Sequence, residues 1–312
     1  MLRLLCFLLC LDAWSQGSLT SSCLFDFAQD AKAKALIGQT DDYVKLQQEL
    51  ERAQRLNSQK PQCVSDYLRR AQNSVLNFTP EEIALLNRAS QELAETFKAY
   101  KLNFPKKIYY LKTNGNEEGA PYTRKNFIVF PNFSLKKNLA DMRELLAHEL
   151  FHILSRYNPK LRDPLYKIIG YHYCGPIIES PELKKIRITN PDAPTYEHYI
   201  KLSKKDGQEF PAIPFLYLKI KSLKEVDDHV VFRHMQLGFV KIDLKTKKTI
   251  GGIIPVEAIA PSLFKQIGNN THYIIHPEET ISDNFAQVMC GLPAKSPRIH
   301  QELKRILRNF EF

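Results

Sequence analysis

The sequence predicts an α+β fold, and three observations support this. Residues 137–157 and 277–289 have the length and apolar spacing of helices, and Gly291 is placed to end the second one. Residues 107–112 and 122–130 have the aromatic and β-branched composition of strands, with a turn signal at Asn114-Gly115. The 312 residues are 25% charged and 44% hydrophobic, which is typical of a globular chain and excludes fibrous and disordered classes.

Residues 24–104 are predicted to be wholly helical. Residues 79–82 read Thr-Pro-Glu-Glu, a capping box with proline at the first helical position. Apolar residues follow at helical spacing as far as Phe104, and Pro105 ends the helix. We therefore interpret residues 16–104 as an N-terminal helical module.

Residues 171–270 have a different composition, rich in Tyr, Lys and Pro with several short strand-like runs. We interpret them as a mainly β insertion. It separates residues 105–170 from residues 271–312, where the helical signal returns.

Residues 1–15 resemble a secretory signal peptide. Arg3 precedes the apolar run 4–11, which is too short to span a bilayer. The small residues Ala13 and Ser15 favour cleavage before Gln16, and a buried N-terminal helix is the alternative. The prediction is a secreted or periplasmic protein, and no later segment has the length of a transmembrane anchor.

Cleavage would leave four cysteines in an exported chain, an even number that favours disulfides. We favour the pairs Cys23–Cys63 and Cys174–Cys290, and four free thiols are the alternative. No C-x-x-C pair is present, so a cysteine metal site or redox site is not expected.

Residues 148–152 read His-Glu-Leu-Phe-His, the pattern H-E-x-x-H, inside the predicted helix 137–157. Because His148 and His152 are four positions apart, both imidazoles project from one face and can reach one Zn²⁺ at about 2.0–2.1 Å. Glu149 would lie beside the metal, where its carboxylate can accept a proton from water. The pattern therefore predicts one Zn²⁺ per chain; a chance match is the alternative.

A catalytic zinc needs a third protein ligand. The metzincin extension of the pattern is excluded, because neither its glycine nor its third histidine follows His152. A glutamate on a later helix is the other common source, and Glu278 and Glu279 begin the predicted helix 277–289. We prefer Glu279, because only Glu279 places Asp283 four positions later on the same face; Glu278 is the competing ligand.

The pattern H-E-x-x-H, followed by E-x-x-S-D at residues 279–283, resembles the gluzincin metallopeptidases, the thermolysin-like enzymes. The resemblance implies that His148, His152 and Glu279 bind zinc, that Glu149 is the general base, and that Asp283 orients His148.

The resemblance also implies a zincin-like catalytic domain made of residues 105–170 and 271–312. Strand 122–130 would then be the edge along which an extended substrate lies. The resemblance covers only residues 122–157 and 276–290. Residues 153–278 separate the two motifs by far more than in thermolysin-like enzymes, so specificity is not inherited from the family.

A peptidase also needs a donor that stabilises the oxyanion. In gluzincins this donor is a Tyr, His or Arg. Tyr273 and His276 are the first candidates because they directly precede the Glu279 helix, and Tyr196 and His198 are further candidates.

The sequence thus predicts a secreted zinc metallopeptidase, a hydrolase of peptide bonds. The net charge of +10 favours a peptide or protein substrate that is acidic or lies on an anionic surface. No nucleic-acid-binding module is recognisable, so nucleic acid is not an expected partner. The alternatives are a zinc hydrolase of cell-wall or other non-protein amides, and a non-catalytic zincin-like binding protein.

Overall fold

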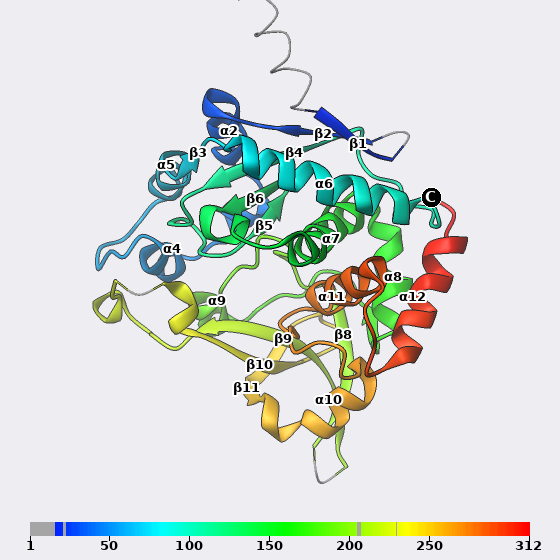
Figure 1. Ribbon diagram of the computed structural model, residues 1–312. Coiled ribbons are helices and arrows are strands. Elements are labelled where there is room, and N and C mark those ends of the chain that lie inside the picture. The colour runs from blue at the N-terminus through cyan, green and yellow to red at the C-terminus, as the bar shows by residue number, and fades with distance from the viewer. Residues whose placement is uncertain (1–15, 21–22, 205–206, 229) are drawn as a thin grey trace, which may run out of the picture.

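The computed structural model describes residues 16–20, 23–204, 207–228 and 230–312. The predicted signal peptide, with Cys6 and Cys10, lies outside these described residues. The fold is mixed α and β, as predicted, with two sheets at opposite ends of the molecule and long helices between them (Figure 1).

The first sheet has six strands in the order β1-β2-β4-β6-β5, with β3 also paired to β4. Strand β2 is parallel to β4 and β4 is parallel to β6, whereas β1, β3 and β5 pair antiparallel with their neighbours. The strands are β1 (Gln16–Thr20), β2 (Cys23–Phe27), β3 (Val75–Leu76), β4 (Lys107–Thr113), β5 (Tyr122–Arg124) and β6 (Phe127–Pro131).

Alternate residues of these strands face two different layers of helices, as the period of two requires. Tyr110 and Ile128 face the main core, which includes residues of α6 (Pro80–Phe97) and α7 (Leu139–Tyr157). Leu111 and Val129 face the other side, where residues of α2 (Asp30–Ile37) and α5 (Val64–Asn73) cover the sheet. The sheet is therefore buried on both faces.

The prediction that residues 24–104 are wholly helical is wrong at β2 and β3. The helices present are α2, α3 (Asp42–Leu46), α4 (Glu49–Arg55), α5 and α6. Strand β2 pairs with β4, more than 80 residues later, so its conformation depends on a partner far along the chain. The capping box before α6 is present as predicted, with the Thr79 side chain bonded to the Glu82 N–H.

The predicted strand 122–130 is two strands in a hairpin. The turn is Lys125-Asn126, with Lys125 at a φ of 47°, and Arg124 pairs with Phe127 across it. The Arg124 side chain is fully buried and bonds Asp41 and the Ile37 carbonyl, which holds the turn against α2 and α3. The edge strand is therefore β5 alone, three residues long.

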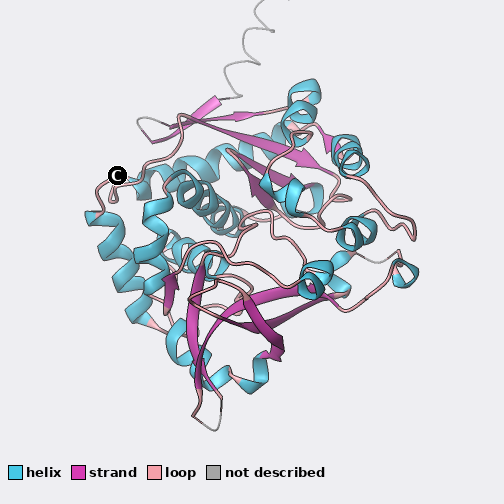
Figure 2. Ribbon diagram, turned by 180° about the vertical axis from the view of Figure 1, so that it is seen from behind, coloured by secondary structure: helices cyan, strands magenta, loops and turns pink. Residues whose placement is uncertain are grey.

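The insertion 171–270 contains the second sheet, which is antiparallel throughout in the order β11-β10-β9-β8-β7. Figure 2 shows this sheet from behind. Its elements are β7 (Tyr171–Tyr173), α9 (Pro181–Ile186), β8 (His198–Ser203), β9 (Glu209–Leu218), β10 (Met235–Ile242), β11 (Thr249–Pro255) and α10 (Ala260–Ile267).

Helices α7, α8 (Pro159–Lys167) and α11 (Pro277–Cys290) lie between the sheets, and α12 (Pro297–Asn309) lies at the edge of the molecule against α8 and α11 (Figure 1). The α7 bounds follow from local chemistry, because the Asn138 side chain caps the Asp141 N–H at the start. Gly291, at a φ of 71°, ends α11 in the left-handed conformation that glycine accepts without strain. No helix in the described ranges is long and apolar enough to cross a membrane.

The four cysteines of the described ranges are free thiols, so the structure contains neither Cys23–Cys63 nor Cys174–Cys290. Cys23 is fully buried in the main core, and burial raises the pKa of its thiol to about 12. Cys63 is exposed and bonds Asp66 at the start of α5. Cys23 and Cys63 therefore lie in different surroundings, one in the core and one at an exposed helix start. An even number of cysteines in the sequence carries no information about such positions.

One buried carboxyl before β5 predicts how stability depends on pH. Glu117 is 2% exposed, its Oε1 accepts a hydrogen bond from Thr113, and its Oε2 has no partner in the described ranges. Burial raises its pKa to about 7. Because the folded state then holds a proton that the unfolded state has lost, stability should fall as pH rises from about 4.5 to about 7.

Glu117→Gln cannot ionise, so it should lose this pH dependence and become more stable than wild type at pH 8 by on the order of 1–3 kcal/mol. Urea unfolding at pH 5 and pH 8 measures the difference, with Glu95→Gln, an exposed residue of α6, as the control. Identical pH profiles for wild type and Glu117→Gln would contradict the assignment.

Candidate metal centre

Helix α7 carries His148 and His152 on the face that meets α11. Their rings are one turn apart, with centroids 4.7 Å from each other. Phe151 packs on Phe285 of α11 at 5.3 Å between ring centroids, which fixes the two helices side by side. The H-E-x-x-H segment is thus rigidly placed by the apolar core around it.

The first turn of α11 presents two glutamates to those histidines. His276 begins the helix, and its Nδ1 accepts the Glu278 N–H at 3.1 Å. Glu278 and Glu279 are each 1% exposed, and their negative charge at the helix N-terminus is favoured by the helix dipole.

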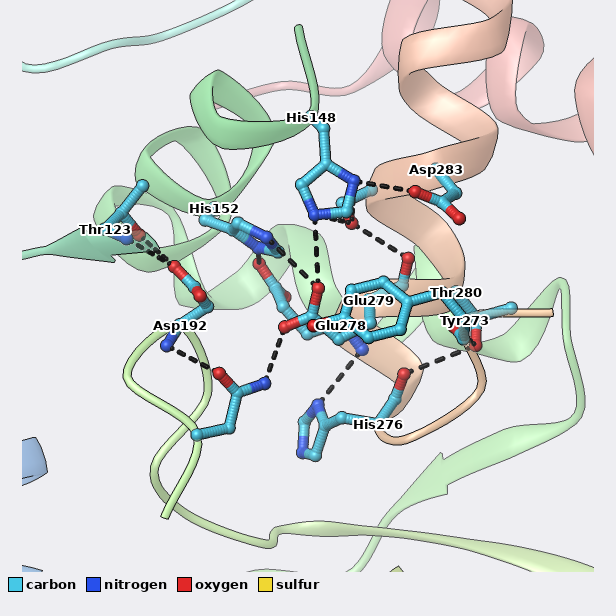
Figure 3. Close-up of polar contacts among 12 residues, drawn as sticks. Thr123, His148, His152, Asp192, Tyr273, His276, Glu278, Glu279, Thr280 and Asp283 are labelled. Atoms are coloured by element: carbon cyan, nitrogen blue, oxygen red, sulfur yellow. Dashed lines mark hydrogen bonds and ion pairs between the residues drawn. The ribbon is translucent and has the colours of Figure 1, made fainter. Parts of the chain in front are cut away.

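His148, His152 and Glu279 converge on one point (Figure 3). The Nε2 atoms of His148 and His152 lie 3.2 and 3.3 Å from the same Glu279 oxygen, Oε2. One ligand atom from each residue lies within 4.8 Å of the other two. The structure therefore brings together the three residues that the sequence motifs predict as metal ligands.

Each histidine is held from behind by a carboxylate. Asp283 bonds His148 Nδ1 at 2.7 Å, and Glu278 bonds His152 Nδ1 at 3.0 Å. Carboxylates at the Nδ1 atoms leave both Nε2 atoms directed inward and increase the basicity of the rings. Asp283 thus lies where the sequence predicts it, while Glu278 supports His152 and does not lie between the histidines.

The supporting carboxylates are themselves fixed. Glu278 accepts hydrogen bonds from Ser155 at 2.7 Å and from the Tyr166 hydroxyl, both buried. Asp283 accepts a hydrogen bond from Thr271. These contacts satisfy negative charges that would otherwise be costly to bury.

The three convergent groups fit a divalent metal. His152 Nε2 is buried and has no hydrogen-bond partner among the described residues, although a charged carboxylate lies beside it. Two imidazole nitrogens and one carboxylate oxygen form a donor set that zinc accepts in catalytic sites.

The pKa shifts of the metal-free centre also indicate that it can accept a cation. Burial opposes protonation of His148, but the Asp283 and Glu279 carboxylates outweigh it and raise its pKa to about 10. Burial acts the other way on Glu279, yet the two histidines hold its pKa well below the usual range. A cation entering the centre would therefore displace protons from imidazole.

Glu149 lies beside this centre on α7. It is 3% exposed, and its Oε2 has no hydrogen-bond partner among the described residues. Burial, and next the neighbouring Asp192 carboxylate, raise the pKa of Glu149 to about 8. Its carboxyl can therefore exchange a proton near neutral pH.

Sequence reasoning missed a group of residues between α9 and β8. The Asn190 side chain donates to Glu279 Oε1, and an Asp192 oxygen lies within 4.8 Å of the polar atoms of Glu149 and His152. Asp192 is anchored on Thr123 of β5. Residues 189–192 read Thr-Asn-Pro-Asp, a polar segment of an insertion that has many other polar residues, so no signal in the sequence sets it apart.

The predicted oxyanion donors separate in the structure. The Tyr273 ring stacks on His148, with centroids 5.9 Å apart and planes 25° apart. Partial burial, and then nearby carboxylates, raise the pKa of Tyr273 well above its usual value, so it keeps its proton although 41% of the residue is exposed. His276 instead caps α11 and packs on Tyr196 and Tyr166, and the His198 ring packs on Tyr166.

No protein-family model, no curated protein and no solved structure matches the chain.

Metal binding should depend on His152 and Glu279. We expect the wild-type chain to bind one zinc, and His152→Ala or Glu279→Ala to lose it, because two donors cannot hold the ion tightly. Zinc titration by calorimetry measures this, with His172→Ala on strand β7 as the matched control. Binding of one zinc at wild-type affinity by His152→Ala would refute the ligand assignment.

Removing the carboxylate behind His148 should weaken the site without unfolding the chain. We expect Asp283→Ala to lower zinc affinity by about 10–100-fold, because the ring loses its orienting acceptor. Glu95→Ala on α6 is the control for loss of one helix carboxylate. If Asp283→Ala keeps wild-type affinity, His148 is oriented by other contacts and the role given to Asp283 is wrong.

Proposed function

We propose that this chain is a zinc-dependent peptidase with a zincin-like catalytic domain of the gluzincin type. The observation that carries the proposal is the position of Glu149: a buried carboxylate beside three convergent metal donors. The antiparallel edge strand β5, next to the H-E-x-x-H helix, supports the zincin-like architecture.

The chemistry follows from the groups around the centre. A bound zinc would supply a Lewis acid that polarises the substrate carbonyl and makes water easier to deprotonate. Glu149 accepts the proton from the attacking water and then gives it to the leaving amine. The Tyr273 hydroxyl, which stays protonated, donates to the oxygen that becomes negative.

Glu149 favours an enzyme over a zincin-like binding protein. A buried carboxyl oxygen without a partner costs stability. A metal site that only stabilises the fold needs no such group, because the ligands and the carboxylates that support them are enough to hold the metal. A loss of stability of this kind is expected at a carboxylate that must accept and release a proton during catalysis.

Peptide substrates fit this chemistry best, and the net charge of +10 favours acidic ones or those on anionic surfaces. We propose a secreted or periplasmic location, which depends on the signal-peptide pattern of residues 1–15.

Glu149→Gln separates binding from catalysis. We expect the variant to keep the fold and one zinc, and to lose hydrolysis by at least about 100-fold, because the amide cannot accept the proton. The measurement is cleavage of a panel of quenched fluorescent peptides by the zinc-loaded protein.

Glu144→Gln is the matched control, since it makes the same substitution on the same helix five residues earlier. It should retain wild-type turnover. Full activity in Glu149→Gln would end the proposed mechanism.

A further inference from the structure

The outer edge of strand β5, which pairs with no further strand in the ranges that the structure describes, is covered by other residues of the same chain. The backbone N–H and the hydroxyl of Thr123 both donate to Asp192 Oδ1, at 2.7 and 2.6 Å. Arg156 contacts the Thr123 carbonyl at 3.5 Å and its hydroxyl at 2.9 Å. An extended chain that paired with this edge would need the same backbone groups.

The segment that covers the edge is held at several points. Thr189 is bonded to Glu51 of α4 through its N–H and its hydroxyl, both at 2.9 Å. The Asn190 side chain joins Glu279 to the Asp192 N–H, and Arg156 donates to the Asp192 carbonyl at 3.1 Å. Residues 189–192 therefore form a fixed wall beside the metal centre.

Asp192 lines two spaces of very different size. One is a cleft of about 590 Å³, lined in part by Arg156, Arg162 and His276. The other is a cavity of only about 50 Å³, lined in part by Tyr122 and Tyr273. Only the cleft has the size of a typical ligand site, and Asp192 lines both.

Solvent reaches the centre at His148, Asp283 and Tyr273. The side chains of His148 and Asp283 are 13% and 28% exposed, and Tyr273 is 41% exposed. The side chains of His152 and Glu279, nearer the wall, are 0% and 1% exposed. A substrate therefore has an approach beside Tyr273, whereas its path along β5 is closed.

We infer that Asp192 is a specificity-determining residue: by occupying the β5 edge at Thr123, it restricts the centre to short substrates whose chain does not continue along that strand. This inference rests on the proposed peptidase function. It predicts that removing the Asp192 side chain joins the cleft to the centre and admits longer peptides.

The test compares a blocked dipeptide with an eight-residue peptide built around the same scissile pair. Asp192→Ala should raise the ratio of kcat/KM values, long over short, by about five- to tenfold, as one recovered backbone hydrogen bond to the Thr123 N–H would give. The ratio cancels any equal effect on both substrates that arises because Asp192 also lies near Glu149. Thr123→Val, which loses one bond to Asp192, should shift the ratio in the same direction by less.

Asp42→Ala is the matched control, because Asp42 lines the same cleft but lies outside the wall. It should leave the ratio unchanged.

Hydrogen exchange of the Thr123 amide in metal-free protein gives a readout without turnover: exchange should be slow in wild type and at least about tenfold faster in Asp192→Ala. Unchanged exchange, or an unchanged substrate ratio, overturns the inference.

Measuring the affinity for uncleaved peptide analogues tests the role of Asp192 independently of whether the protein is a peptidase. Calorimetry on zinc-loaded protein would compare peptide hydroxamates of one and of four residues. If Asp192→Ala gains affinity only for the longer compound while no form cleaves peptides, the wall is supported and the peptidase proposal fails. If wild type cleaves both peptide lengths equally well, the peptidase proposal holds and the wall is refuted.

Discussion

The packing of α11 against α7 is the interaction on which the site depends. Phe285 and Phe151 fix the distance between the helices, and the first turn of α11 then places Glu279 between His148 and His152. Neither helix carries the site alone, because the histidines and the glutamate are more than 120 residues apart in sequence. A small shift of α11 would separate all three donors together.

Burial of so many charges near one point constrains the surrounding structure. Each imidazole is hydrogen-bonded through Nδ1 to a carboxylate. Glu278 in turn accepts hydrogen bonds from the Tyr166 and Ser155 hydroxyls, and Asp283 accepts one from the Thr271 hydroxyl. Such a network is stable only when nearly every member is satisfied. His152 Nε2 and Glu149 Oε2 are among the buried atoms that have no hydrogen-bond partner in the described part of the chain, and they are the atoms assigned to the metal and to proton transfer.

Local signals predicted the elements that carry this site. The helix 137–157 and the helix 277–289 could be recognised because caps, proline and Gly291 mark their ends. Strand β2 could not, since its pairing with β4 is remote in sequence, and the hairpin at Lys125 has no glycine to mark its turn. The pattern of ligands was visible because H-E-x-x-H and E-x-x-S-D each lie within one helix. Asp192 and Asn190 lie on a connecting segment, so only the tertiary fold brings them to the centre.

We propose that His148, His152 and Glu279 bind one metal ion through the atoms that converge in the structure. Anomalous diffraction at the zinc edge, from crystals of the zinc-loaded chain, tests it most directly. We expect a single strong peak at bonding distance from the two Nε2 atoms and the Glu279 carboxylate, about 2.0–2.2 Å. A zinc held by Glu278 in place of Glu279, or bound at Asp192 without His148, would contradict it.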